Sequence, residues 1–336
     1  MTCKHLIMSV IGAAALLGAA VPGFAVTVPV LGTAQDFAVL GHTGVSNTGP
    51  TVVFGSAITL ANVGVYEAGA NAVSGFSLAG NTFYGPGTFT DGPGLVNAPA
   101  GIHGGDGVAL LARNDLITAY TALASYGTAI DLSGQILGNG VGGVVPTLGP
   151  GVYSFSSTAQ LNGTLQLDAG GLDGGFWVFQ IGTDLTTASA SAVQLINPGG
   201  NLGSDVGVFW VLGTSGTAGL GSATLGTTTA FEGNILALTS ITLTTGATIY
   251  NGRALAINAA VTLDTNTISN ICPPGSSSPN SGPGFSGGLG FDTITGELVP
   301  TGPTGPPPVI PEPFTLGSLA LGLGALYGCV RRRARR

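Results

Sequence analysis

Between about residues 30 and 270, the chain is a series of short apolar runs separated by glycine. The runs are rich in Val, Ile, Thr and Ala, and in many of them apolar and polar positions alternate. Alternation with a period of two in β-branched residues is typical of strands that bury one face. The pattern therefore predicts a mainly β protein.

One segment departs from this pattern. Between Gly107 and Tyr126, apolar residues recur at helical spacing, and polar residues such as Arg113 and Thr118 lie off that stripe. The stripe consists of Ala112, Leu116, Ala119, Leu123 and Tyr126. Such spacing predicts one amphipathic helix over about residues 107–126.

Five of the strand-like runs align in a common register: TAQLN at 158–162, DLTTA at 184–188, SATLG at 222–226, SITLT at 240–244 and AVTLD at 260–264. Alternation then sends one set of residues to one side of the strands. That set is Ala159, Leu161, Leu185, Thr187, Ala223, Leu225, Ile241, Leu243, Val261 and Leu263. The other side receives Thr158, Gln160, Asp184, Thr186, Ser222, Thr224, Ser240, Thr242, Ala260 and Thr262.

The spacing of the runs indicates how they connect. Thr224 and Thr242 are 18 residues apart, and Thr242 and Thr262 are 20 apart, which fits one turn of a solenoid better than a hairpin. Outward residues would then form a flat lattice, with rungs about 4.8 Å apart, that could order water. A simpler alternative is that threonine suits any exposed strand. The near absence of Lys, Arg and Glu on this face favours a function, because charges normally protect exposed sheets from self-pairing.

A family resemblance extends this interpretation. The segments at 31–49, 150–155, 176–186, 208–213 and 231–268 resemble microbial ice-binding proteins that have a discontinuous β-solenoid. The resemblance runs from about Leu31 to Ile268 and implies a right-handed, three-sided β-solenoid with one long helix packed alongside. It also implies a monomeric domain over residues 26–271 that binds ice through one flat face, without cofactor or metal.

The resemblance also implies a site. Members of that family often carry a Thr-(Ala/Gly)-x-(Thr/Asn) pattern on the ice-binding face, and approximate matches lie at 43–46, 221–224, 239–242 and 259–262. The expected ice-binding residues are Thr158, Thr186, Ser222, Thr224, Ser240, Thr242, Ala260 and Thr262. Gln160 and Asp184 depart from the pattern, and their bulk or charge is expected to interrupt a water lattice. A second departure, at residues 61–67, follows an extra run, FGSAITL.

Both ends of the chain resemble targeting segments rather than parts of a folded domain. Residues 1–25 have the pattern of a secretory signal, to be removed by signal peptidase, and residues 272–310 have the Gly/Ser/Pro composition of a linker. Residues 311–336 join Pro311, Glu312 and Pro313 to an apolar run and an arginine cluster. This tail resembles the PEP-CTERM sorting signal, which implies an exosortase-like processing enzyme; an ordinary transmembrane anchor is the alternative. Either implies export across the inner membrane, followed by anchoring at the cell envelope or release.

Charge and cysteine content exclude several classes of partner. Residues 26–310 contain only Arg113 and Arg253 against fourteen acidic residues, a net charge of −12, so nucleic acid is not an expected partner. Cys272 is the one cysteine in that range, which rules out an intramolecular disulfide and a cysteine metal cluster there.

The residues that could support catalysis are few, and we predict no enzyme. His42 and His103 are expected at the surface, and the Gly-x-Ser-x-Gly match at 284–288 lies in the predicted linker, without a strand and helix around it. Arg253 is expected to hold a carbonyl or an acid at a corner. The single acids are expected to cap turns: Asp168, Asp173, Asp184, Asp205 and Asp264. A surface adhesin or exopolysaccharide matrix protein remains the rival hypothesis, although no aromatic residues mark the proposed face.

Overall fold

The computed structural model describes residues 27–56, 60–67, 72–200, 205–271 and 285–301. The predicted secretory signal at 1–25 and the motif Pro311-Glu312-Pro313 lie outside the described residues. Within them the protein is mainly β, with parallel sheets and one α-helix, as predicted. In the described part of the chain, no helix is long and apolar enough to cross a membrane.

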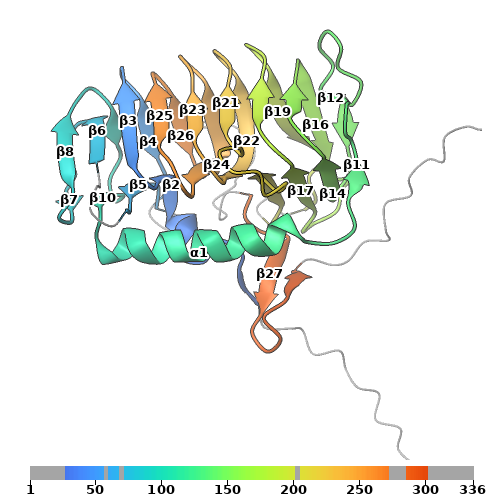
Figure 1. The fold of residues 1–336 in the computed structure, drawn as a ribbon, viewed down its shortest axis with the longest axis horizontal. Coiled ribbons are helices and arrows are strands. Elements are labelled where there is room, and N and C mark those ends of the chain that lie inside the picture. The colour runs from blue at the N-terminus through green and yellow to red at the C-terminus, as the bar shows by residue number, and fades with distance from the viewer. Residues whose placement is uncertain (1–26, 57–59, 68–71, 201–204, 272–284, 302–336) are drawn as a thin grey trace, which may run out of the picture.

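A nine-stranded sheet forms one side of the molecule (Figure 1). All of its neighbouring strands run parallel. In spatial order the strands are β12 (Ile136–Leu137), β15 (Ala159–Leu161), β18 (Leu185–Thr187), β21 (Ala223–Leu225), β23 (Ile241–Leu243), β25 (Val261–Asp264), β3 (Gly44–Thr48), β6 (Ala72–Phe76) and β8 (Thr88–Asp91). We call it the hydroxyl sheet.

The remaining parallel strands make two further columns within one sixteen-stranded sheet. The helix-side column contains β11 (Ile130–Asp131), β14 (Gly151–Phe155), β17 (Phe176–Ile181), β20 (Gly207–Leu212), β22 (Ala230–Ala237), β24 (Thr248–Ala256), β2 (Phe37–Gly41), β5 (Asn62–Val65), β10 (Ile102–Gly104) and β7 (Phe83–Tyr84). The lateral column contains β13 (Thr147–Leu148), β16 (Thr164–Asp168), β19 (Ala192–Ile196), the first halves of β22 and β24, β26 (Thr267–Ser269), β4 (Val52–Phe54) and β9 (Leu95–Val96). Strand β22 serves both columns because its register with β24 shifts between Glu232 and Asn234, where Gly233 has a φ of 102° and stands against two residues of β24.

Along the chain, the coil passes from the helix-side column to the hydroxyl sheet and then to the lateral column, except between β6 and β7, where no lateral strand intervenes. The coil is discontinuous, because β24, β25 and β26 near the end of the domain pair with β2, β3 and β4 near its start. The helix α1 (Gly107–Ala124) runs along the coil and connects its two ends (Figure 1).

Apolar side chains fill the coil. Rings from successive rungs stack inside it: Phe179 and Trp210 lie opposite each other in β17 and β20, with centroids 3.9 Å apart and planes 7° apart. Parallel in-register pairing places like side chains above one another, so the alternation seen in the sequence becomes a continuous core. A second cluster joins α1 to the helix-side column and the 3-10 turn η1 (Gly32–Asp36).

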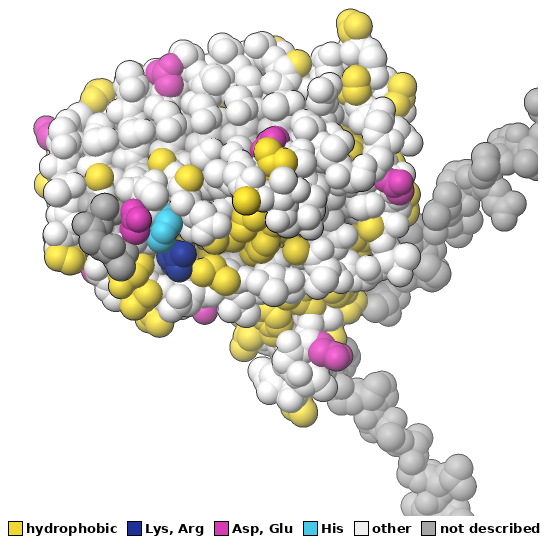
Figure 2. All heavy atoms as spheres, in the orientation of Figure 1, with side chains coloured by type: hydrophobic (Ala, Val, Ile, Leu, Met, Phe, Trp, Pro, Cys, Tyr) yellow, Lys and Arg dark blue, Asp and Glu magenta, His cyan; other side chains and the backbone are white. Residues whose placement is uncertain are grey.

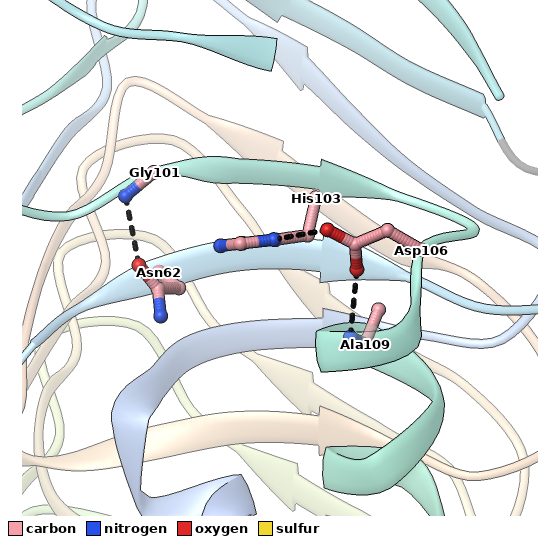
Figure 3. A network of polar contacts seen from close by, with 5 residues as sticks. All are labelled: Asn62, Gly101, His103, Asp106 and Ala109. Carbon is pink, nitrogen blue, oxygen red and sulfur yellow. Dashed lines mark hydrogen bonds and ion pairs between the residues drawn. The ribbon is translucent and has the colours of Figure 1, made fainter. Parts of the chain in front are cut away.

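Helix α1 begins at a polar cap that Figure 3 shows in detail. Asp106 accepts a hydrogen bond from the Ala109 amide at 2.8 Å through Oδ1, and its Oδ2 lies 2.6 Å from Nδ1 of His103. The predicted stripe is buried from Ala112 to Leu123, together with Ala109. The helix ends at Ala124, two residues before the predicted end, so Tyr126 packs on the same cluster from outside the helix.

The structure differs from the sequence prediction at residues 285–301, which were assigned to a linker. Strands β27 (Leu289–Asp292) and β28 (Leu298–Pro300) form a hairpin whose first strand pairs antiparallel with β1 (Thr27–Pro29). The composition does not reveal this pairing, because only two apolar side chains of the segment are fully buried, with Leu298 packed against the core as a partly buried residue. The two buried side chains are Phe285 and Leu289, which are 3% and 1% exposed.

Candidate functional site

The predicted register of the hydroxyl sheet is confirmed. All ten residues assigned to the inward side are buried. The outward residues are exposed or partly exposed, and Gln160, Thr186, Thr224, Thr242 and Thr262 stand opposite one another on successive strands. The approximate motif match at residues 43–46 also lies on this face. Its last residue, Ser46, pairs with Thr262 across the junction between the two ends of the coil.

The row continues beyond the residues that sequence reasoning selected. Ser46 faces Ser74 in β6, and Ser74 faces Thr90 in β8. These two strands were missed because an insertion precedes them and because Thr-Phe-Thr is too short a pattern to align. We call the complete row the hydroxyl column: Thr186, Thr224, Thr242, Thr262, Ser46, Ser74 and Thr90.

The side chains of the hydroxyl column are available to solvent. Within the described residues they have no protein hydrogen-bond partner. The neighbouring outward row behaves differently, because Ser240 donates to Ser222 at 3.0 Å and the hydroxyls of Thr158 and Thr183 lie 2.9 Å apart. Hydroxyls paired in this way have less capacity left for water, so the hydroxyl column is the stronger candidate surface.

Asp184 does not extend over the sheet as a free charge. Its Oδ1 accepts hydrogen bonds from the amides of Gly221 at 3.1 Å and Ser222 at 2.7 Å, on the next rung. The carboxylate therefore secures a corner of the coil, in line with the turn-capping role predicted for the acids. Asp168 acts similarly, accepting from the Gly170 amide at 2.8 Å. The expectation that Asp184 interrupts the lattice is weakened, because its charge is held by backbone donors.

Gln160 marks a real change in the surface. A shallow groove of about 290 Å³ opens beside it at the β15 end of the sheet. Its lining consists of Ile136, Gln160, Leu161, Asn162, Thr186, Thr187 and Ala188. The regular lattice therefore ends at β18, and Thr158, which was among the predicted site residues, lies beyond that end, directly before β15.

The lateral column is a less regular surface. Its strands β19 and β22 pair only at Ala192 and Ala230, and the carboxyl group of Glu232 then accepts from the Leu195 amide at 2.9 Å. Burial of this carboxyl group raises its pKa to about 7, and the bond from Leu195 partly offsets that shift. Partly exposed Tyr250 and Phe54 lie on the same column. The lateral column is therefore less regular than the hydroxyl sheet between β19 and β22.

Charge is sparse over the molecule. Viewed with α1 in front, the surface carries few charged side chains, and these lie apart over most of it (Figure 2). Within the described residues, no three His, Cys, Asp or Glu side chains gather as a metal site. This face thus carries mainly uncharged groups.

One of the two histidines occupies a different environment from the one predicted. His103 is buried, 8% exposed, because it stacks on Tyr84 at a centroid distance of 5.0 Å and contacts Asp106. The prediction of a surface position was wrong for this residue. His42 is partly buried, and its Nδ1 lies 2.7 Å from the Tyr66 carbonyl and 3.1 Å from Nε of Arg113. Both histidines thus have structural contacts.

Arg253 performs the structural role predicted for it. Its guanidinium is buried and donates to the Gln35 carbonyl at 2.9 and 2.7 Å and to Oδ1 of Asn234 at 2.7 Å. Burial lowers the pKa of Arg253 to about 9, and the nearby Asp36 carboxylate acts in the opposite direction. Ser286, the serine of the Gly-x-Ser-x-Gly match, is likewise buried, and it is followed by β27 rather than by a helix.

Comparison with known proteins agrees with this architecture. The model of a family described as ice-binding-like matches residues 39–269. An ice-binding protein of Nostoc sp. (strain HG1) is 46% identical over 248 residues, covering 74% of this chain and 76% of the relative. An ice-binding protein of Flavobacterium frigoris (strain PS1) is 32% identical, covering 71% and 75%.

A solved structure shares the fold as well. The crystal structure of an ice-binding protein from an Antarctic biological consortium is 31% identical, with a TM-score of 0.53, and covers 73% of this chain and 92% of its own. The regular hydroxyl sheet, the discontinuous coil and its helix, and the sequence identity agree with one another, and the chain belongs to the ice-binding-like family.

Proposed function

We propose that this protein binds ice through the hydroxyl column and thereby restrains ice growth or recrystallisation. The observation that carries the proposal is a row of seven in-register Thr and Ser side chains whose hydroxyls have no protein partner among the described residues. Strand neighbours lie about 4.8 Å apart, so the row presents evenly spaced hydroxyl groups to water. Threonine adds rigidity, since its β-branched side chain has restricted χ1 rotation.

Many contacts have to act together in this mechanism. One hydrogen bond exchanged with water contributes only about 1 kcal/mol, so adsorption requires a coplanar array. Hydroxyl and methyl groups would order a water layer that merges with the ice lattice. Ice between adsorbed molecules would then have to grow with a curved front. No cofactor or metal is needed for this function.

The test uses residues 26–301, the range that contains the described part of the chain, and a Thr242→Tyr/Thr262→Tyr variant. Both side chains lie mid-row, so two bulky rings should break the coplanar surface and abolish thermal hysteresis and inhibition of recrystallisation. Thr267→Tyr is the matched control, because Thr267 is partly exposed on the lateral column. Loss of activity in Thr267→Tyr alone would place the ice-binding site on the lateral column instead. A folded but inactive wild type would favour the adhesin or matrix-protein alternative.

We further infer that the coil is right-handed, because nearly all parallel β-crossover connections are right-handed. We also propose that the protein is exported and reaches the cell envelope through residues 311–336, by PEP-CTERM-type processing or as an anchored protein. The motif and apolar run in the sequence support this proposal. Mass spectrometry of the mature protein tests it, since retention of residues 314–336 would refute cleavage near Pro313.

A further inference from the structure

The two ends of the coil, which lie far apart in Figure 1, are finished differently. At the β12 end, the chain covers its own strand edge, because the amides of Val144 and Val145 donate to the Ile136 carbonyl at 3.0 and 3.3 Å. That carbonyl points away from β15, since the carbonyl of the next residue, Leu137, accepts from the Asn162 amide at 2.9 Å. The outer edge of β12 is therefore already occupied by the chain itself.

The opposite end is open. Its outermost strands are β8 in the hydroxyl sheet and β7 in the helix-side column, and among the described residues each pairs with a strand on one side only. Such an edge presents unpaired backbone groups, which proteins usually protect with lysine, proline or a covering segment. The β8 sequence, Thr-Phe-Thr-Asp, contains neither lysine nor proline; Pro86 and Pro93 lie just outside it. This edge can therefore pair with a further strand.

Apolar side chains flank the open edge on both sides. Tyr84 in β7 is 47% exposed, and Leu95 in β9 is 43% exposed. One face of the Tyr84 ring stacks on His103 of the neighbouring strand β10, so its other face is directed past the end of the coil. Phe89 in β8 is partly exposed and contacts Phe83, with ring centroids 5.4 Å apart. The open end thus combines a strand edge with apolar groups.

We propose that this end is an interface between two copies of the chain, in which the β8 strands pair antiparallel about a two-fold axis perpendicular to the hydroxyl sheet. Residues that stand opposite each other in an antiparallel pair point to the same face. With Phe89 opposite Phe89 of the second copy, Thr88 stands opposite Thr90, so aromatic rings meet on the inner face and hydroxyl groups on the outer face. Pro86 limits the pairing, because it has no amide hydrogen.

The same symmetry matches the flanks of the interface. Rotation about this axis brings the helix-side column of each copy against the lateral column of the other, so Tyr84 faces Leu95 of the second copy. The contact occurs twice, as in any isologous interface. Charge does not oppose it, because Asp91 stands opposite Gly87. The two Asp91 carboxylates are then about 13 Å apart along the strands, which exceeds the Debye length of about 10 Å at physiological salt.

A second copy joined by the two open ends fits this surface better than a head-to-tail stack. A stack would need a free edge on β12, which Val144 and Val145 cover. The two-fold arrangement uses each open end once and closes, so it forms dimers and no fibres. Strands of two to four residues make a contact smaller than the roughly 800 Å² per partner of a standard interface, so we expect a dissociation constant on the order of 100 µM. This replaces the monomer that the family resemblance implied.

Dimerisation would enlarge the proposed ice-binding surface. It joins two nine-stranded hydroxyl sheets into one continuous sheet, with both outer faces on the same side. Thr90, at the end of the hydroxyl column, would continue into Thr88 of the second copy. The effect on ice rests on the proposed function, because adsorption needs many coplanar contacts. The pairing itself does not depend on ice binding.

Sedimentation equilibrium of residues 26–301 with Cys272→Ser tests the interface. This range contains both buried clusters, and the serine prevents disulfide-linked dimers. We expect the mass to rise from that of a monomer at about 10 µM toward that of a dimer at about 1 mM. Leu95→Lys should stay monomeric, because it places a charge beside Tyr84 of the second copy. Leu172→Lys is the matched control, since Leu172 is also 43% exposed but follows β16, outside the interface.

Thermal unfolding of both lysine variants verifies that they fold. A wild type that remains monomeric at about 1 mM, or a Leu95→Lys variant that dimerises as well as Leu172→Lys does, would overturn the proposal.

Cross-linking tests the register. Two versions of the same chain carry Thr88→Cys or Thr90→Cys and are oxidised separately and as a mixture. Directly opposite residues of an antiparallel pair have Cβ atoms about 5 Å apart, whereas the diagonal pairs that join like positions are about 7 Å apart. Disulfides require the shorter distance, so the mixed dimer should form about tenfold faster than either dimer of one version. Equal rates, or faster linkage between like positions, would overturn this pairing.

Thermal hysteresis separates this inference from the proposed ice binding. At about 1 mM the wild type should exceed Leu95→Lys by about twofold per chain, and at about 10 µM the two should coincide. If the wild type dimerises in buffer without any thermal hysteresis, the proposed ice binding fails and the interface stands. If it shows thermal hysteresis but remains monomeric, the interface fails and the proposed ice binding stands.

Discussion

Glu232 makes the stability of this domain depend on pH, in a direction that the structure determines. Its carboxyl group lies between β19 and β22, beyond the single pair that joins these two strands. It accepts one backbone hydrogen bond, from the Leu195 amide. Burial raises its pKa from 4.5 to about 7. The folded state therefore holds the proton more tightly than the unfolded chain does, and stability falls as pH rises from about 4.5 to 7.

The magnitude follows from the shift. A displacement of about 2.5 pH units corresponds to roughly 3 kcal/mol of stability, which is present below pH 4.5 and lost above pH 7. For a domain of this size, that amounts to roughly 5–10 °C in Tm. Glu232→Gln keeps an oxygen that can accept from Leu195 and removes the titration, so the variant should exceed the wild type by most of this amount at pH 8.

The assay is thermal and urea unfolding of residues 26–301 at pH 4, 5, 6, 7 and 8. Taking the difference between wild type and Glu232→Gln at each pH cancels the titration of the other acids. Glu297→Gln, at an exposed position in the hairpin turn, is the matched control and should show no such trend. A difference that stays flat with pH, or a wild type that gains stability relative to the variant as pH rises, would refute the reasoning.

Three further perturbations test the fold. Arg253→Met leaves buried carbonyl groups without their donor and should cost about 3–5 kcal/mol in urea unfolding, whereas Arg113→Met should cost less than about 1 kcal/mol. Gly75→Ala should destabilise far more than Gly80→Ala in thermal unfolding. Both glycines have φ near +80°, but only at Gly75 would a Cβ meet a backbone oxygen, at 1.9 Å. Ending the chain at residue 271 removes the buried side chains of Phe285 and Leu289. The free energy of unfolding should fall by about 3–6 kcal/mol relative to residues 26–301. Ice activity, which is measured in the cold, should persist.

The parts of the fold that follow from periodicity were predictable from the sequence. Alternation gave the inward and outward sides of β15 to β25 correctly, and helical spacing located α1, because both patterns repeat over several residues. The contact of residues 285–287 with the coil, by contrast, depends on backbone groups of Phe285 and Gly287, and backbone hydrogen bonds leave almost no trace in composition. His103 was misjudged for a related reason: only the fold brings Tyr84 over its ring.

The site was only partly predictable, for the same physical reason. Outward direction could be assigned from alternation, but the partner of each hydroxyl could not, since Ser222 and Ser240 meet only when their rungs stack. The sequence therefore combined two rows that the structure separates. The prediction from the sequence also ended the row at Thr262 and at the motif match that contains Ser46. It could not follow the row further, because the junction between β25 and β3 joins residues more than 200 positions apart.

Structural and surface tasks are divided among the polar residues. Asp184 and Arg253 hold corners through backbone groups, and Asn266 does the same by donating to Thr244 at 2.9 Å and to Ala247 at 3.0 Å. The hydroxyl column makes no such bonds among the described residues, so its side chains stabilise the coil little beyond their strand preference. A surface that contributes so little to folding can be fitted to its ligand with little cost in stability. Such a division is expected where the ligand is an extended lattice that many weak, coplanar contacts must match at once.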